Sequence, residues 1–122
     1  MIRQFRFQDV FLGGTLFVAA CTIASPQDKR TFGESVESMV WASHCAGSPE
    51  HAPIPPFDER IARIKKSAES LGLLGAYERA AHDANEELAQ IELVCDGLET
   101  GREDFSEALA TLEDFLAEEI AG

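Results

Sequence analysis

The chain has 122 residues and a formal net charge of −12, with hydrophobic residues at 45 % and charged residues at 26 %. A single domain of this length can bury a core without a metal or a disulfide framework, and this composition argues against disorder of the whole chain. So strong a negative charge repels nucleic acids and acidic membranes, which argues against direct nucleic-acid binding.

The negative charge is unevenly distributed along the chain. Residues 1–45 carry four basic and four acidic residues, whereas the rest of the chain carries six basic and eighteen acidic residues. We therefore describe residues 1–122 as one domain with three parts. These are a neutral, apolar N-terminal part (1–45), a proline-rich loop (46–56) and an acidic helical part (57–122).

The first segment has two structural interpretations. Two apolar runs separated by Gly13 and Gly14 are typical of a β-hairpin. The alanine-rich stretch at residues 16–24 is instead typical of a buried helix that leads into the next one. We favour a helix here and keep a short N-terminal β-hairpin as the alternative.

The same segment also contains the pattern of an export signal. Arg3 and Arg6 precede the uncharged residues 10–27, and residues 18–21 (Val-Ala-Ala-Cys) resemble the cleavage site of bacterial lipoproteins, in which the cysteine is acylated. Asp9 and the paired glycines weigh against this interpretation. The apolar run is too short for a transmembrane segment, because a span needs about 20 apolar residues.

The cysteines are too few for a disulfide framework. With only Cys21, Cys45 and Cys95, we expect a cytoplasmic protein whose reduced cysteines serve as small apolar residues. The alternative is an exported lipoprotein acylated at Cys21, which would leave Cys45 and Cys95 as an even pair.

Downstream, the pattern is helical. Pro26 suits a first helical position, and apolar residues follow helical spacing to about Cys45. The loop at 46–56 contains four of the five prolines and interrupts the helices. Helical spacing resumes at Phe57 and breaks near Gly72 and Gly75. It then continues through a run of residues spaced four and three apart: Tyr77, Ala81, Ala84, Leu88, Ile91, Cys95 and Leu98.

A short turn bracketed by Gly97 and Gly101 separates this run from a last helix, for which Thr100 and Glu103 fit a capping box. So short a turn predicts that the final two helices are neighbours. The predicted fold is therefore mostly α: a single compact domain of four to five helices that ends in an antiparallel helical hairpin.

Acidic residues off the apolar stripes are the best candidates for function. We predict partner binding by Glu103, Glu107, Asp114, Glu118, Asp83, Glu86 and Glu87. This pattern favours a non-catalytic adaptor, inhibitor or immunity-type factor that docks on a basic protein surface, in one version by mimicking nucleic acid.

The acidic surface also has two interpretations that need no basic partner. The acidic residues can form a solvated face, and they can be neutralised within the chain by the basic residues Arg60, Arg63, Lys65 and Lys66. A homodimer that packs through Ala81 and Ala84 is a related possibility, because small residues allow close helix approach.

Metal binding and catalysis have little support. His44, Cys45 and His51 form an incomplete zinc ligand set, since zinc needs about four ligands. The chain contains no phosphate-binding loop, nucleophile elbow or paired-cysteine redox motif. We therefore predict no catalytic residue, cofactor or metal site, and a metal-binding or enzymatic helical domain is the third interpretation.

Overall fold

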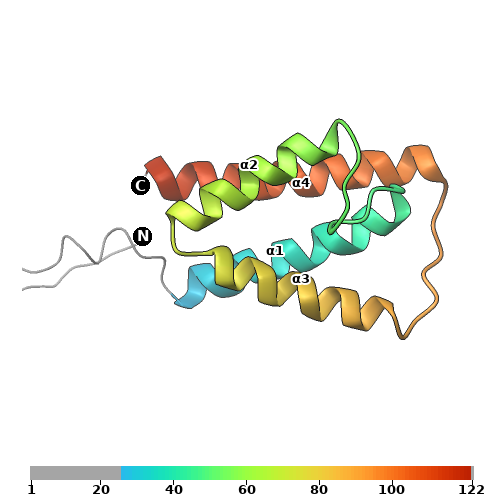
Figure 1. Cartoon of the computed structure of the whole chain (residues 1–122), viewed down its shortest axis with the longest axis horizontal. Coiled ribbons are helices and arrows are strands. Elements are labelled where there is room, and N and C mark those ends of the chain that lie inside the picture. Colours follow the sequence, from blue (N-terminus) through green and yellow to red (C-terminus); the bar gives the residue numbers. More distant parts are fainter. Residues whose placement is uncertain (1–25, 122) are drawn as a thin grey trace, which may run out of the picture.

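The computed structural model describes residues 26–121, which form a compact, all-helical fold (Figure 1). It contains four helices: α1 (Pro26–Cys45), α2 (Phe57–Ser70), α3 (Leu74–Leu88) and α4 (Leu98–Ala121). No strand is present in this part of the chain, so the mostly α class is confirmed. The proposed N-terminal helix or β-hairpin lies outside the described residues.

The four helices pack in a ring. α1 packs against α3 and α4, and α2 packs against the same two helices from the other side. α1 and α3 run in one direction, whereas α2 and α4 run in the opposite direction (Figure 1). Each helix thus has two neighbours, and the pairs α1/α2 and α3/α4 are not in contact.

Aromatic side chains connect the helices in the core. Phe32 of α1 is fully buried, and its ring centroid lies 5.6 Å from that of Phe115 on α4 and 6.5 Å from that of Tyr77 on α3. Between α2 and α4, the ring centroids of Phe57 and Phe105 lie 4.6 Å apart. Such tilted aromatic pairs stabilise a core beyond the area that they bury.

The alanines of α3 are buried within the chain itself. Ala81 and Ala84 are 6 % and 1 % exposed. The neighbouring Ala80 lies 3.9 Å from the position that a Cβ would occupy at Gly33 of α1. Ala80 therefore lies at the approach of α3 to α1, and burial of Ala81 and Ala84 in the core of the single chain leaves them unable to form the helix contact suggested for a homodimer.

The helix predicted to reach Leu98 ends at Leu88 instead. Residues 89–97 form a non-helical linker, and α4 begins at Leu98 rather than near the predicted cap at Thr100. The last two helices do run antiparallel (Figure 1). They are not packing neighbours, however, and the prediction that a short turn brings them together is wrong.

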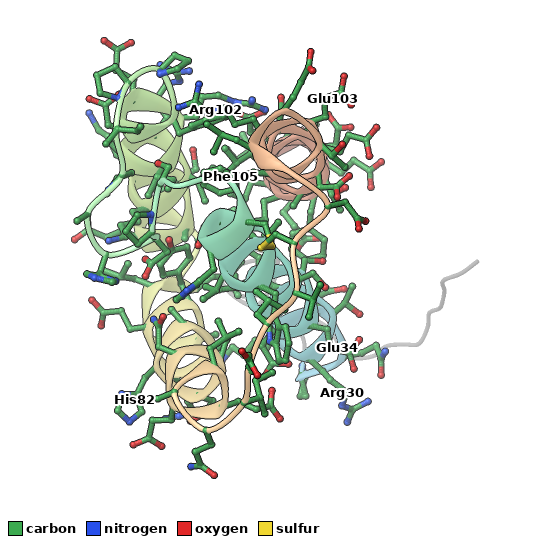
Figure 2. The ribbon with its side chains drawn as sticks, turned by 90° about the vertical axis from the view of Figure 1, so that its right-hand side faces the viewer. Arg30, Glu34, His82, Arg102, Glu103 and Phe105 are labelled. Carbon is green, nitrogen blue, oxygen red and sulfur yellow. A yellow bond between two sulfur atoms is a disulfide. The ribbon has the colours of Figure 1, made fainter. Side chains whose placement is uncertain are left out.

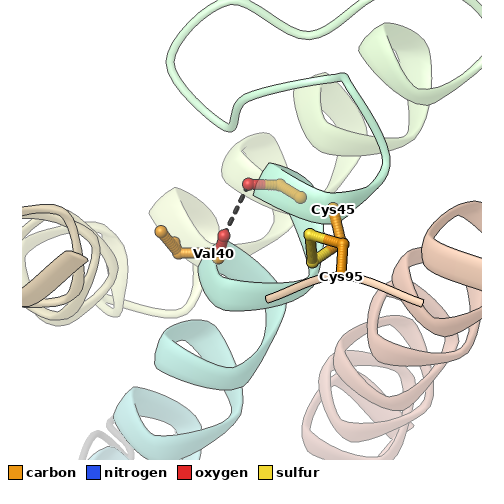
Figure 3. Close-up of a disulfide and its surroundings, with 4 residues drawn as sticks. Val40, Cys45 and Cys95 are labelled. Atoms are coloured by element: carbon orange, nitrogen blue, oxygen red, sulfur yellow. Dashed lines mark hydrogen bonds between the residues drawn. A yellow bond between two sulfur atoms is a disulfide. The ribbon is translucent and has the colours of Figure 1, made fainter. Parts of the chain in front are cut away.

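A disulfide explains the course of this linker. Cys45, the last residue of α1, is bonded to Cys95, with 5.4 Å between the Cα atoms (Figure 3). The linker is thereby fixed to the end of α1 instead of continuing α3. The expectation of reduced, apolar cysteines is wrong for this pair.

The start of α4 packs closely against Cys45 at the end of α1. Gly101 is buried, and a Cβ at this position would overlap the carbonyl group of Cys45. Glycine is therefore required by the close approach of two backbones, and not by the turn that was predicted there.

The loop between α1 and α2 is held by buried polar groups. The N–H of Ile54 donates a hydrogen bond to Ser48 Oγ at 2.9 Å. The Tyr77 hydroxyl donates to Glu50 Oε2 at 2.7 Å, and Lys65 Nζ lies 3.6 Å from the same oxygen. Burial, reinforced by the charge of Glu50, raises the pKa of Tyr77. Tyr77 therefore stays protonated and remains the donor.

Within residues 26–121, the helices are too short or too polar to cross a membrane.

Breaking the disulfide should destabilise the fold. The bond joins residues 50 positions apart, and a loop of this size is worth about 4 kcal/mol in the free energy of unfolding. We expect Cys95→Ser to lower the urea midpoint accordingly, measured by circular dichroism. Wild-type protein in a thiol reductant is the control and should match the variant. An unchanged midpoint on reduction would contradict the role given to this bond.

Candidate functional site

Four acidic residues of α4 form an exposed face, here called the α4 acidic face: Glu103, Glu107, Asp114 and Glu118. The opposite side of the helix is buried through Phe105, Leu109, Leu112 and Leu116. In Figure 2, Glu103 points away from the molecule and Phe105 points into it. This division follows from helical periodicity, which places charged residues opposite the apolar stripe.

Three of the four basic residues of α2 form ion pairs with carboxylates outside this face. Arg60 binds Glu113 at 2.7 Å, Arg63 lies 3.9 Å from Glu59, and Lys65 reaches the buried Glu50. Within the described part of the chain, no ion pair involves a residue of the α4 acidic face. The structure therefore does not support neutralisation of this face by α2.

Arg60 and Glu113 attach α2 to α4. Arg60 Nε donates to Glu113 Oε2 at 3.0 Å, while Nη2 donates to Oε1 at 2.7 Å, which makes the pair bidentate. Arg60 also donates to the hydroxyl and the carbonyl oxygen of Ser106. Bidentate arginine–carboxylate pairs are among the stronger charged contacts. No local sequence pattern signals a pair separated by 53 residues.

The ion pair shifts the pKa values of Arg60 and Glu113 in the directions expected for opposite charges. The hydrogen bond from Arg60 lowers the pKa of Glu113, and the same bond raises the pKa of Arg60. Both side chains are partly exposed, at 22 % for Arg60 and 34 % for Glu113, so solvent screening moderates the effect. The contact holds α4 in place and leaves its outer acidic residues free.

Negative charge is also crowded at the far end of α4. Partial burial raises the pKa of Glu119, and the nearby carboxylates of Asp28 and Glu118 raise it further. Glu118 belongs to the α4 acidic face, so the negative charge of this face also raises the pKa of the neighbouring Glu119. A basic partner that approached here would relieve this repulsion.

The acidic residues predicted on α3 do not join this face. Asp83, Glu86 and Glu87 are exposed, but α3 does not contact α4. The structure therefore separates the predicted binding residues into two surfaces. Of the two, the α4 acidic face is the longer, because it extends from Glu103 to Glu118.

The candidate metal ligands do not come together as a site. Cys45 is bonded to Cys95, so no thiolate remains to complete the set with His44 and His51. A different grouping, His82, Asp83 and Glu86, brings ligand atoms within 4.8 Å of one another on the surface of α3. His82 Nε2 lies 3.3 Å from Glu86 Oε2, the ordinary contact of residues four apart on a helix. We assign it no further role.

Comparisons with protein-family models, with curated proteins and with solved structures found no match. Function must therefore be inferred from the geometry and charge of this chain.

Glu113 and Glu119, whose pKa values are shifted in opposite directions, should contribute to the free energy of unfolding with opposite dependence on pH. The pKa of Glu113 is lowered by folding, so its contribution is complete above its ordinary value of 4.5 and is lost as the pH falls through the folded value. We expect Glu113→Gln to cost about 1 kcal/mol at pH 7 and nothing in strong acid.

Glu119→Gln is the matched control. Because folding raises the pKa of Glu119, its favourable contribution exists at low pH and is lost as the pH rises through the folded value. This variant should therefore not destabilise the protein at pH 7. Urea unfolding of both variants from about pH 3 to about pH 8 measures the two dependences, and parallel curves would contradict these assignments.

Proposed function

We propose that this protein is a non-catalytic binding protein whose α4 acidic face docks on a basic surface of a partner protein. One observation carries the proposal: the carboxylates of this face are exposed and without an ion pair to the described residues, while three of the four basic residues of α2 pair elsewhere. Like charges spaced four apart on a helix cost a few tenths of a kcal/mol per pair. The arrangement is therefore not explained by stability.

The mechanism would be electrostatic steering followed by contact. The net charge of −12 attracts a basic partner over a distance of about 10 Å at ordinary salt. Close contact with the α4 acidic face then sets orientation and register. An adaptor, an inhibitor or an immunity-type factor would work in this way. In one version, the carboxylates occupy a partner surface that otherwise binds nucleic-acid phosphates.

Matched charge reversals test this proposal. One variant carries Glu107→Lys, Asp114→Lys and Glu118→Lys on α4. The control variant carries Asp83→Lys, Glu86→Lys and Glu87→Lys on α3; these acids were also predicted to bind a partner, but they lie outside the α4 acidic face, to which the proposal assigns docking. Both variants change the net charge equally, and the reversed residues lie on helix surfaces away from the core, so both should keep their helical circular dichroism.

The measurement is capture of partner proteins from native lysate at low and high salt. We expect wild type and the α3 variant to retain a stoichiometric basic partner at low salt, and the α4 variant to lose it. Equal capture by the α4 variant, or equal loss in both variants, would contradict a role for this particular face.

A second proposal concerns where the protein works. We propose that it is exported and acylated at Cys21, in preference to a cytoplasmic location. The disulfide between Cys45 and Cys95 supports this proposal, because such bonds persist mainly in oxidising compartments. The pairing also leaves Cys21 as the remaining cysteine, within the Val-Ala-Ala-Cys pattern at residues 18–21. Anchoring and partner binding are compatible.

Intact mass of the protein from its native cell tests the anchor. We expect the loss of residues 1–20 and the addition of acyl groups to Cys21. Cys21→Ser is the control and should retain the uncleaved, unmodified N-terminus. A full-length wild-type chain without added mass would contradict this proposal and leave the docking proposal untouched.

A further inference from the structure

Exposed apolar side chains gather along the linker between α3 and α4. Among residues 26–121, five large apolar side chains are exposed, and three of them lie on or beside this linker: Ile91 at 46 %, Val94 at 85 % and Leu98 at 53 %. Scattered exposed apolar residues are normal, whereas a local group of them is typical of an interaction surface.

Residues 92–96, here called the strap, alternate as in a β-strand. Glu92, Val94 and Asp96 are exposed, whereas Leu93 packs against the core and Cys95, which is also exposed, is bonded through its sulfur to the end of α1. Successive side chains that face opposite sides are the geometry of an extended strand. The strap is therefore held to the protein through Leu93 and the Cys95 sulfur, and it presents Glu92, Val94 and Asp96 to solvent.

The backbone of the strap is unpaired. Within the described chain, no hydrogen bond joins an N–H or a carbonyl group of residues 92–96 to another residue. The nearest backbone bonds are from Ile91 to Leu88 and from Gly101 to Gly97. An extended segment with free donors and acceptors is a template for a second strand.

The disulfide holds the strap in place. Because Cys95 lies within the strap and is bonded to Cys45 of α1, the segment is attached to the helical core in the absence of any partner (Figure 3). A segment ordered beforehand loses less conformational entropy on binding.

Charge disfavours a second copy of this chain as the occupant. Antiparallel pairing of two straps centred on Val94 would place Glu92 of one copy opposite Asp96 of the other. Like charges directly opposite each other destabilise a strand pair. A segment with basic residues at these positions would instead gain from both carboxylates.

A hollow beside the strap also suits a basic side chain of a partner. It has a volume of about 530 Å³ and is lined by Leu98, Glu99, Arg102, Glu103 and Ser106. Its lining carries two carboxylates and one guanidinium, that of Arg102, whose Nε donates to the carbonyl oxygen of Ala46 at 3.4 Å. The remaining negative charge beside an exposed leucine suits a lysine or arginine side chain, which has an apolar stem and a charged head. Glu103 belongs both to this hollow and to the α4 acidic face, so the two surfaces are continuous.

We propose that the strap binds an extended, basic segment of a partner protein by backbone pairing, and that a basic side chain of that segment enters the hollow beside Leu98. This inference rests on the proposed docking function and specifies the form of the partner that is recognised. Backbone bonds to residues 92–96 would supply affinity, while Glu92, Asp96 and Glu103 would select basic residues.

The experiment uses two synthetic peptides as probes of the full chain. The first alternates valine and lysine. The second has the same sequence with the amide groups of one edge N-methylated, which removes its backbone donors but keeps its charge. Calorimetric titration should show binding of the first peptide and a loss of about tenfold or more for the second. Hydrogen exchange should show new protection at residues 92–96.

Two variants separate backbone pairing from nonspecific attraction. Val94→Pro removes one N–H of the strap, and proline suits an extended conformation on its N-terminal side; it should weaken binding of the first peptide about tenfold. Ile120→Ser removes an exposed apolar side chain at the other end of α4 and should leave binding unchanged. Circular dichroism and an intact disulfide confirm that each variant is folded.

Several results would overturn the inference. These are equal binding of the two peptides, protection confined to α4, no binding of the first peptide, or a dimer that protects the strap in the absence of peptide. None of these results bears on the charge reversals in α4. Loss of partner capture in that α4 variant, together with equal binding of both peptides, would retain the docking function and reject strand pairing.

Discussion

The bond between Cys45 and Cys95 determines how the last third of the chain is placed. It fixes the middle of the linker to the end of α1, and the first turns of α4 then pack so closely on Cys45 that only glycine fits at position 101. With the linker fixed there, α4 lies beside α1 and α2 and does not contact α3. One cross-link between distant parts of the chain thus fixes the linker that leads into α4, and core packing holds α4 in the ring of helices.

The two proposed binding surfaces follow from this arrangement. α4 is held from its inner side by aromatic packing and by Arg60, which binds Glu113 and Ser106. The outer carboxylates therefore remain free to act on a partner. At the start of the same helix, the cross-link keeps an extended segment ordered without using its backbone hydrogen-bonding groups. A long-range negative field and a local strand template would then act in succession, the first on the rate of encounter and the second on the lifetime of the complex.

Much of this fold was predictable from local patterns. The helix that ends at Cys45, the non-helical loop at 46–56 and the helix that starts at Phe57 follow from proline positions and apolar spacing. The same spacing wrongly predicted that the helix of Tyr77 continues through Ile91 to Leu98, whereas α3 ends at Leu88. Periodicity is a local signal, so it contains no information about a disulfide to a residue 50 positions away. Exposure of the acidic residues could be predicted from the opposite apolar stripe. Which acids share a surface could not, because this depends on which helices are neighbours.

The most direct test of the central constraint is disulfide mapping of the protein isolated without reductant. Free thiols are alkylated before digestion, and the peptides are identified by mass spectrometry. The structure requires one linked pair of peptides that contains Cys45 and Cys95, with neither residue alkylated. Alkylation of both residues, or a bond from either one to Cys21, would contradict the arrangement on which the placement of the linker and of α4 depends.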